Sequence, residues 1–384
     1  MNKKTVAVLF GGKSPEHEVS IITAIQLMYA LKGAGHEALP VYISKEGQWY
    51  LGDDSFWNPK TFSDQKKAIY KKPKIFLPVG QTENFYLQEL PEYFSFFKTQ
   101  QKFNFDIAFP CLHGRNGEDG SIQGVLELAN VPYVGCGVDS SAIGIDKALS
   151  KNIAQNLGIP VLQHIILEKG QKLPLGIKYP VYVKPARLGS SIGISRANNE
   201  TELKDALEVA YFYDTKVLIE EAAKDFIEVN ISLIGNGPYE ASPTEQPLAT
   251  SEILSFEDKY LSHEGNTKGM ATAKRKIPAP IKNATTKKIQ DYAKQFFKTI
   301  NGKGICRIDF IVSKDEKKVY FNEINTLPGS LSFYLWKEAG VSFSELVDKL
   351  VKFGLEEYKQ KQNLITTFES NILSSFKGAK AVKL

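Results

Sequence analysis

Four polar residues interrupt the stretch CRIDFIVSKDEKKVYFNEINTLPG, which otherwise has the pattern of two β-strands joined by a lysine-rich turn. Side chains two residues apart share a face of a strand, so Arg307 points the same way as Asp309. The same rule pairs Glu323 with Asn325. With the turn in the middle of the lysine-rich segment, Asp309 lies opposite Asn322 or Glu323. Two carboxylates this close repel each other unless a cation lies between them.

A divalent metal ion is the cation that suits these groups. Carboxylate and amide oxygens are the ligands that Mg²⁺ prefers, and Mg²⁺ commonly shares itself with nucleotide phosphates. The sequence therefore predicts that Asp309, Glu323 and Asn325 hold a metal ion. The alternative is a polar sheet face that Arg307 and solvent keep neutral.

A glycine loop with nearby lysines supplies a place for those phosphates. In VKPARLGSSIGIS, Lys184 ends a predicted strand, and a turn through Ser190 and Ser191 leads into the next one. Backbone N–H groups and hydroxyls in such a loop can wrap phosphate oxygens, although the GxxxxGK[ST] pattern is absent. Lys184 and the upstream Lys147 would act as point charges. The alternatives are an ordinary hairpin turn and solvated lysines.

Two earlier loops follow predicted strands and should open on one crevice, because ligands of open α/β sheets bind at the carboxyl ends of strands. FGGKSPEHEVS carries Glu16, a candidate receptor for an ammonium group, unless it is only a strand–helix turn. LHGRNGEDGSIQG carries His113, which is either a substrate-site or a structural histidine. Neither loop has the GxGxxG fingerprint of a dinucleotide site.

The elements that must position these residues divide the chain into four parts. Strands and helices alternate over residues 1–140, which predicts an open α/β domain. We expect residues 50–102 within it to be an insertion with little regular structure. Residues 141–236 form a second unit, and residues 237–357 form a third that contains the hairpin. The remainder, 358–384, is a tail whose small and basic end we expect to be disordered.

Composition limits the class of protein. The chain has 384 residues, 42% of them hydrophobic, enough for two or three domains with full cores. A net charge of +5 is small and spread out, which argues against nucleic acid and membranes as partners. Cys111, Cys136 and Cys306 have no CxxC spacing, which favours a reducing cytoplasm. The first apolar run is too short for an export signal, so we expect a cytoplasmic protein.

A series of motifs occurs in a fixed order: GGKSPEHEVS, HGRNGEDGSIQG, GIDKALSK, YPVYVKPARLGSSIGIS, VLIEE, DKYLS, RIDF and NEINTLPG. In type and order they resemble those of the D-alanine–D-alanine ligases of the ATP-grasp superfamily, over about residues 4–355. The resemblance implies an α/β fold of three domains, in which an open α/β N-terminal domain precedes two α+β domains that sandwich ATP. It also implies a homodimer.

The resemblance assigns roles to individual residues. It implies that phosphate contacts come from Lys147, Lys184 and Ser191, adenosine contacts from Glu220, Glu221 and Glu228, and two Mg²⁺ sites, which Mn²⁺ can replace, from Asp309, Glu323 and Asn325. It further implies that Glu16, hydrogen-bonded with Ser190 and Tyr260, receives the ammonium of the first substrate, that His113 and Ser332 contact substrates, and that Lys259 and Tyr260 belong to a lid.

The implied reaction is ATP-dependent ligation of two D-alanine molecules for peptidoglycan synthesis. Phosphoryl transfer from ATP turns a carboxylate into an acyl phosphate with a good leaving group, and the amine of a second molecule then attacks. Arg307 and the Gly329 N–H are candidate donors to the oxyanion that develops.

Three other functions compete with this one. D-lactate or D-serine could replace the second D-alanine, although Tyr260 favours the dipeptide, because relatives that form depsipeptides usually differ there. A non-catalytic nucleotide-binding protein would not need the metal ligands and Arg307 together. A Rossmann dehydrogenase would need the missing glycine fingerprint.

Overall fold

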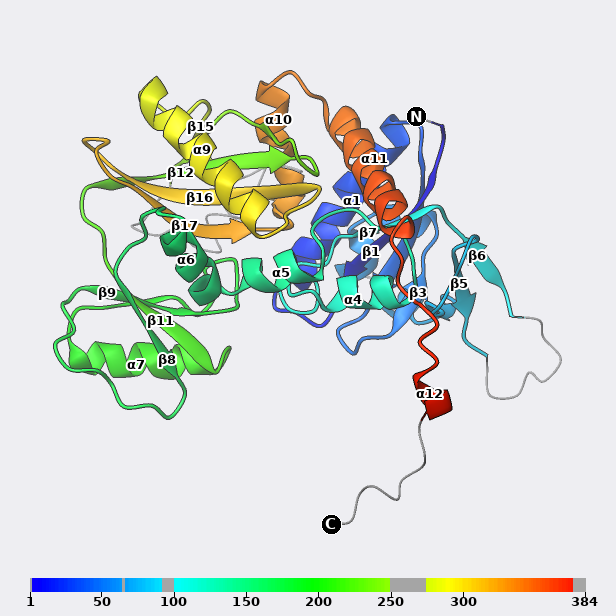
Figure 1. The fold of residues 1–384 in the computed structure, drawn as a ribbon, viewed down its shortest axis with the longest axis horizontal. Helices are drawn as coiled ribbons and strands as arrows, with labels where there is room; N and C mark the ends of the chain where they lie inside the picture. The colour runs from blue at the N-terminus through cyan, green and yellow to red at the C-terminus, as the bar shows by residue number, and fades with distance from the viewer. Residues whose placement is uncertain (1, 64–65, 92–99, 249–273, 376–384) are drawn as a thin grey trace, which may run out of the picture.

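A seven-stranded mixed sheet forms the centre of the N-terminal part of the protein (Figure 1). The computed structural model describes residues 2–63, 66–91, 100–248 and 274–375. The strand order is β6-β5-β4-β3-β2-β1-β7, and β1 is parallel to both β2 and β7. The strands are β1 (Thr5–Gly11), β2 (Glu37–Ile43), β3 (Trp49–Leu51), β4 (Lys74–Phe76), β5 (Tyr86–Glu89), β6 (Lys102–Asn104) and β7 (Ile107–Pro110).

The insertion expected to lack regular structure instead extends this sheet, so that expectation was wrong. From β2 to β6, each strand pairs antiparallel with the next. Tyr50, Ile75 and Leu87 are the buried centres of β3, β4 and β5. A strand of three or four residues with one buried side chain has no readable alternation, and it forms because a neighbouring edge offers partners.

Helices complete the first domain. They are α1 (His17–Gly33), the short η1 (Asp54–Trp57), α2 (Lys60–Ser63) and α3 (Lys66–Ile69), then α4 (Ser121–Leu128) and α5 (Val138–Ile145). The strand–helix alternation predicted for this domain is therefore confirmed in its parallel half. The loops that carry Glu16 and His113 follow the carboxyl ends of β1 and β7, which are neighbours in the sheet.

The second sheet has the order β10-β9-β11-β8 and is antiparallel throughout. Its strands are β8 (His164–Glu168), β9 (Val181–Pro185), β10 (Ser195–Ala197) and β11 (Lys216–Glu221). Helix α7 (Glu200–Tyr211) covers one face, where Val183 and Ile219 pack with Leu203. Because side chains alternate, Lys184 and Glu220 lie on the other face.

The third sheet has the order β13-β12-β16-β17. Its strands are β12 (Phe226–Ile234), β13 (Glu240–Ala241), β16 (Ile305–Ser313) and β17 (Val319–Asn325), and the pair β14 (Gln246–Pro247) and β15 (Arg275–Lys276) lies beside it. Helix α9 (Asn283–Thr299) covers its apolar face, where Phe296 packs with Ile308 and Phe310. The division at residue 236 stays a prediction, but sheet membership alone would divide the chain between β11 and β12.

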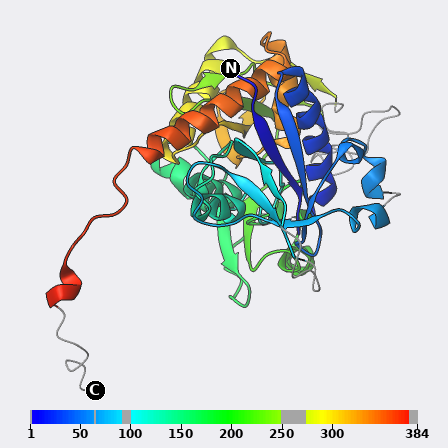
Figure 2. The same cartoon turned by 90° about the vertical axis from the view of Figure 1, so that its right-hand side faces the viewer.

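The chain finally returns to the first domain. After η3 (Gly329–Ser332) and α10 (Phe333–Glu338), helix α11 (Phe343–Gln362) packs beside α1 (Figure 1). Leu346 and Leu350 join Val6 and Phe10 in one buried cluster. The last described residues, including the short α12 (Ile372–Ser375), extend away from the body (Figure 2). In the described residues, no helix is both long and apolar enough to span a bilayer.

Candidate active site

A cavity that is partly open to solvent lies between the second and third sheets. Its walls include most of the residues predicted to bind nucleotide or metal: Lys184, Ser191, Glu220, Glu221, Glu228, Asp309 and Glu323. Two further predicted residues, Lys147 and Asn325, are not among the residues that line it. The structure therefore brings together residues that are up to 139 positions apart, from Lys184 to Glu323.

The hairpin of β16 and β17 has the predicted register. Asp309 lies opposite Glu323 and Arg307 opposite Asn325, with an irregularity just after Asp309. Arg307 donates two hydrogen bonds of 2.7 Å to Asp309, from Nε to Oδ1 and from Nη2 to Oδ2. Asn325 Nδ2 donates to Asp309 Oδ2 at 3.3 Å. Both members of the Arg307–Asp309 pair are buried, so the Arg307 guanidinium neutralises the Asp309 carboxylate.

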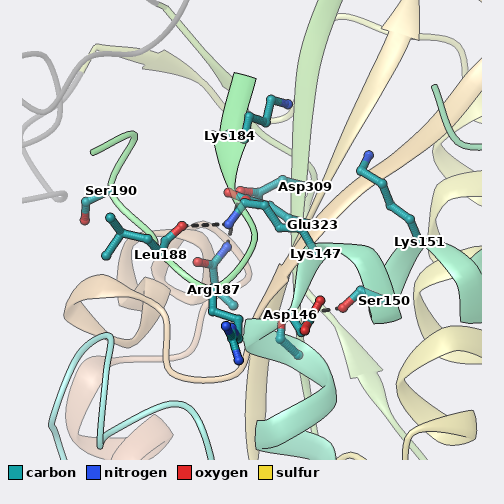
Figure 3. A network of polar contacts seen from close by, with 12 residues as sticks. Asp146, Lys147, Ser150, Lys151, Lys184, Arg187, Leu188, Ser190, Asp309 and Glu323 are labelled. Atoms are coloured by element: carbon teal, nitrogen blue, oxygen red, sulfur yellow. Dashed lines mark hydrogen bonds and ion pairs between the residues drawn. The ribbon is translucent and has the colours of Figure 1, made fainter. Parts of the chain in front are cut away.

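Lys147 neutralises the second carboxylate of the hairpin. It is the first residue of α6 (Lys147–Asn156), which the side chain of Asp146 caps by accepting from the backbone N–H of Ala148 at 3.0 Å. The Lys147 ammonium donates to the Leu188 carbonyl at 2.7 Å and lies 3.1 Å from Glu323 Oε2 (Figure 3). It thereby connects the loop that follows β9 to the acidic hairpin.

The residues present fit a magnesium site. Asp309 and Glu323 are cross-strand neighbours that line the cavity. Asn325, two residues after Glu323, adds an amide that contacts Asp309. In the described residues, no group of three His, Cys, Asp or Glu side chains could hold a metal, so protein ligands alone would be few. Two carboxylates and an amide suit Mg²⁺, which keeps waters and takes phosphate oxygens for its remaining positions.

Glu220 is contacted by two lysines, one of which the sequence prediction missed. Lys184 of β9 hydrogen-bonds Glu220 Oε1. Lys151 of α6 lies 2.6 Å from Glu220 Oε2. Burial disfavours charge on Glu220, but the two ammonium groups outweigh burial and lower the pKa of Glu220 to about 2. Lys151 stands four residues after Lys147 in GIDKALSK, and this helical spacing was the signal that could have revealed it.

Glu16 forms a second polar centre, where the first domain meets the second. Its carboxylate is buried; Oε1 accepts from the Ser190 hydroxyl, and Oε2 has no hydrogen-bond partner among the described residues. Ser190 and Ser191 hold left-handed backbone conformations, with φ of 53° and 58°. Burial raises the pKa of Glu16, and the negative charge of Glu118 raises it further. An unpartnered buried carboxylate oxygen beside a phosphate-type loop can receive a substrate ammonium.

A hydrogen-bonded chain through Thr23 joins His113 to the C-terminal part. His113 lies 3.9 Å from Glu118, and its Nε2 is 2.9 Å from the Thr23 hydroxyl. The Ser330 N–H donates to the same hydroxyl at 3.3 Å, next to Gly329. Thr23, inside an apolar helix, gave no sequence signal. This chain places the predicted oxyanion donor Gly329 close to His113.

Three further residues were predicted to belong to the site. The side chain of Ser332 is fully buried, and its hydroxyl has no partner among the described residues, so its contact with a substrate stays a prediction. Lys259 and Tyr260 lie outside the described residues, so their part in a lid stays a prediction as well.

Two sheets that face each other across a cavity lined with a lysine, several carboxylates and Ser191 of the glycine–serine loop define an ATP-grasp fold. Two family models match the chain, "D-ala D-ala ligase N-terminus" over residues 5–136 and "D-ala D-ala ligase C-terminus" over residues 153–352. The chain belongs to the D-alanine–D-alanine ligase family.

Individual relatives match along nearly the whole chain. The D-alanine–D-alanine ligase of Caldicellulosiruptor bescii is 36% identical over 378 residues, which cover 95% of this chain and 98% of that protein. The solved D-alanine–D-alanine ligase of Coxiella burnetii is 28% identical, with a TM-score of 0.77, and covers 94% of this chain and 97% of that one. The solved VanG D-Ala:D-Ser ligase of Enterococcus faecalis is 29% identical, with a TM-score of 0.75, and covers 92% of this chain and 100% of that one.

Proposed function

We propose that this protein joins two D-alanine molecules into D-alanyl-D-alanine at the expense of ATP, through a D-alanyl phosphate, to supply peptidoglycan synthesis. The observation that carries the proposal is the hydrogen bond from the Ser190 hydroxyl to the Glu16 carboxylate. An amino acid whose ammonium is received by Glu16 presents its own carboxylate to the loop that leads to the nucleotide cavity. That carboxylate is then the group to be phosphorylated.

The nucleotide half of the site orients and neutralises ATP. Lys147 and Lys184 would turn from their carboxylate partners to the phosphates, and the Ser190–Ser191 loop would close over them. Glu220, Glu221 and Glu228 line the part of the cavity left for the adenosine. Asp309, Glu323 and Asn325 would hold Mg²⁺, or Mn²⁺ in its place, which when bound neutralises the charge of the transferring phosphoryl group.

The acceptor half stabilises charge on the acyl carbon. When the second amine attacks the acyl phosphate, negative charge develops on the carbonyl oxygen, and Arg307 and the Gly329 N–H would donate to it. The bidentate contact with Asp309 fixes the plane of the Arg307 guanidinium, so that it does not have to be ordered during the reaction. The attacking amine must be neutral, and the tetrahedral carbon then collapses with release of phosphate.

The second substrate is the point on which family members differ. The solved D-Ala:D-Ser ligase that this chain resembles makes D-serine a specific alternative. The sequence relatives at 34–36% identity are described as D-alanine–D-alanine ligases, which favours D-alanine as the second substrate of this chain. D-lactate is a third candidate, and a chain that binds nucleotide without turnover is the fourth.

One assay separates these candidates. Purified protein receives ATP and Mg²⁺ with D-alanine alone, with D-alanine plus D-serine, or with D-alanine plus D-lactate, while phosphate release and product mass are followed. We expect D-alanine alone to give phosphate and the dipeptide. A mixed product that dominates at equal concentrations would reassign the second substrate, and nucleotide binding without phosphate release would leave only the binder.

We also propose a cytoplasmic homodimer. The three cysteines are buried and free, which accords with a reducing compartment. Light scattering of the purified protein tests the dimer, and a monomer at assay concentrations would contradict it.

A further inference from the structure

Two lysines share one buried carboxylate, and their positions differ. Lys184 lines the nucleotide cavity, and 12% of its side chain is exposed. The side chain of Lys151 is only 1% exposed, and Lys151 is not among the residues that line the cavity. Glu220 itself is 1% exposed. One carboxylate therefore has a cation that can reach a ligand and a cation that cannot.

We infer that Lys151 is a positioning residue, which keeps the charge of Glu220 compensated while Lys184 leaves Glu220 for the phosphates of ATP. The inference rests on the proposed function, because it requires a nucleotide in the cavity. Lys151 touches neither nucleotide nor amino acid; it acts through Glu220 and Lys184.

The physical reason is the cost of a lone buried charge. Removing one partner of a buried ion pair leaves the other uncompensated, which is far more costly than losing an exposed pair. Without Lys151, each transfer of Lys184 to a phosphate would leave the buried Glu220 carboxylate without a cation. Glu220 would then hold Lys184 back and also repel the triphosphate.

The charge balance of the cluster supports the same conclusion. Lys151, Lys184 and Glu220 together carry one net positive charge, which an entering phosphate can use. With Lys151 neutral, the cluster has none. Burial lowers the pKa of Lys151, and Glu220 is the largest influence that opposes this, as expected if the pair depends on each other. Burial acts on Lys184 in the same direction, but Glu220 outweighs it and raises the pKa of Lys184.

Helix α6 explains how Lys151 is held in place. Lys147 and Lys151 are one turn apart on the same face, and they contact Glu323 of the third sheet and Glu220 of the second. Figure 3 shows Lys147 and Lys151 on this helix. Helix α6 thus supplies Lys147 to the proposed phosphate site and Lys151 to Glu220.

The test is a double-mutant cycle read by nucleotide binding without D-alanine. Calorimetry with Mg²⁺ and a non-hydrolysable ATP analogue compares wild type, Lys151→Met, Glu220→Gln and the double variant. We expect Lys151→Met to weaken nucleotide binding at least about tenfold, because Lys184 stays on Glu220. In the Glu220→Gln background, where no anion holds Lys184, the same substitution should change binding less than about twofold.

Lys216→Met is the matched control. Lys216 pairs with Asp146 and so joins β11 to the start of α6, as Lys151 does further along, but it does not line the cavity. It should lower the melting temperature without weakening nucleotide binding. In assays of turnover, Lys151→Met should raise the KM for ATP and leave the KM for D-alanine unchanged.

The outcomes separate this inference from the proposed function. If wild type binds no nucleotide, the proposed function fails first. If wild type binds the analogue, either of two results would make Lys151 only structural. Lys151→Met could bind the analogue as well as wild type does, or the substitution could weaken binding as much in the Glu220→Gln background as in wild type. Should Lys151→Met not fold, a crystal structure of wild type with the analogue decides: Lys184 on the phosphates with Lys151 still on Glu220 is expected, and Lys184 still on Glu220 would overturn the inference.

Discussion

The charges on the two walls of the cavity are compensated differently. Beside the second sheet, Lys184 of β9 and Lys151 of α6 both contact the buried Glu220, and Glu221 also lines the cavity. On the third sheet, Asp309 and Glu323 are joined by Glu228 on the cavity wall, against Arg307 alone. Lys147 lies between the walls and shares itself with the acidic one.

The difference teaches that the two walls call for different parts of a ligand. Glu220, contacted by two lysines, can release one of them to an anion, whereas the carboxylates of the third sheet call for added cations. A triphosphate with divalent metal ions would satisfy both at once, which a neutral ligand could not do. The same opposition predicts that substitutions on the two walls fail in different ways.

Removing charge from the acidic wall should have the largest effect. Asp309→Asn or Glu323→Gln takes away a proposed metal ligand, so we expect kcat for phosphate release to fall at least about 10³-fold. Asp309→Asn should also lower the melting temperature, because it leaves the buried Arg307 without its ion-pair partner. Steady-state phosphate release and circular dichroism measure the two quantities. Substantial residual turnover would count against the metal assignment.

Asp315→Asn is the control for the acidic wall. It removes a carboxylate from the exposed turn of the same hairpin, where Asp315 pairs with Lys317. Activity should stay within about twofold of wild type, since exposed pairs contribute little. A loss similar to that of Asp309→Asn would mean that hairpin folding, not metal binding, is being measured.

Removing the lysine from the second-sheet wall should act on nucleotide affinity. Lys184→Met deletes the charge-assisted contact to phosphate that we propose, and it leaves Glu220 with Lys151 alone. We expect the KM for ATP to rise about 100-fold, with a smaller change in kcat. Initial rates at varied ATP concentration test this. An unchanged KM for ATP would remove Lys184 from the nucleotide site and end the contrast between the walls.

Glu16→Gln should spare both walls and affect the amino acid. A neutral amide accepts a hydrogen bond but not an ion pair, so the KM for D-alanine should rise about 10- to 100-fold while the KM for ATP is unchanged. Kinetics with each substrate varied in turn test this. A rise in the KM for ATP instead would assign Glu16 to the nucleotide.

The pH dependence of Glu16 adds a second measurement. Its pKa is raised above 4.5 by burial and by Glu118, so the wild-type KM for D-alanine should rise as pH falls through that raised pKa. A raised carboxyl pKa stabilises the fold below 4.5, and this stabilisation is lost as pH rises through the folded-state pKa. Glu16→Gln should therefore not lower the melting temperature at neutral pH. A lowered one would show that the charged carboxylate supports the fold.

Glu228→Gln should have the smallest effect. Glu228 lines the cavity on the acidic wall beside Phe226, where it is the candidate for the ribose hydroxyls. An amide still accepts a hydrogen bond, so we expect less than about a tenfold rise in the KM for ATP. A loss of kcat as large as that of Glu323→Gln would instead make Glu228 a metal ligand.

Local pattern determined much of this protein. The apolar run before Gly11, the helix from His17 to Gly33 and the hairpin that pairs Asp309 with Glu323 follow from side-chain periodicity, which acts between near neighbours. Periodicity failed where strands are too short to show it, as in the edge strands of the first sheet that bury only Tyr50 or Ile75 at their centres.

Only the tertiary structure decided which distant groups share a charge. Nothing near Lys151 in the sequence reveals that Glu220 lies 2.6 Å away, or that Thr23 joins His113 to the turn after Gly329. Such contacts depend on how sheets and helices dock, which is set by the shapes of whole buried surfaces and not by any short stretch. The sequence could thus name most of the chemical groups, whereas packing decided which of them are buried together and must compensate one another.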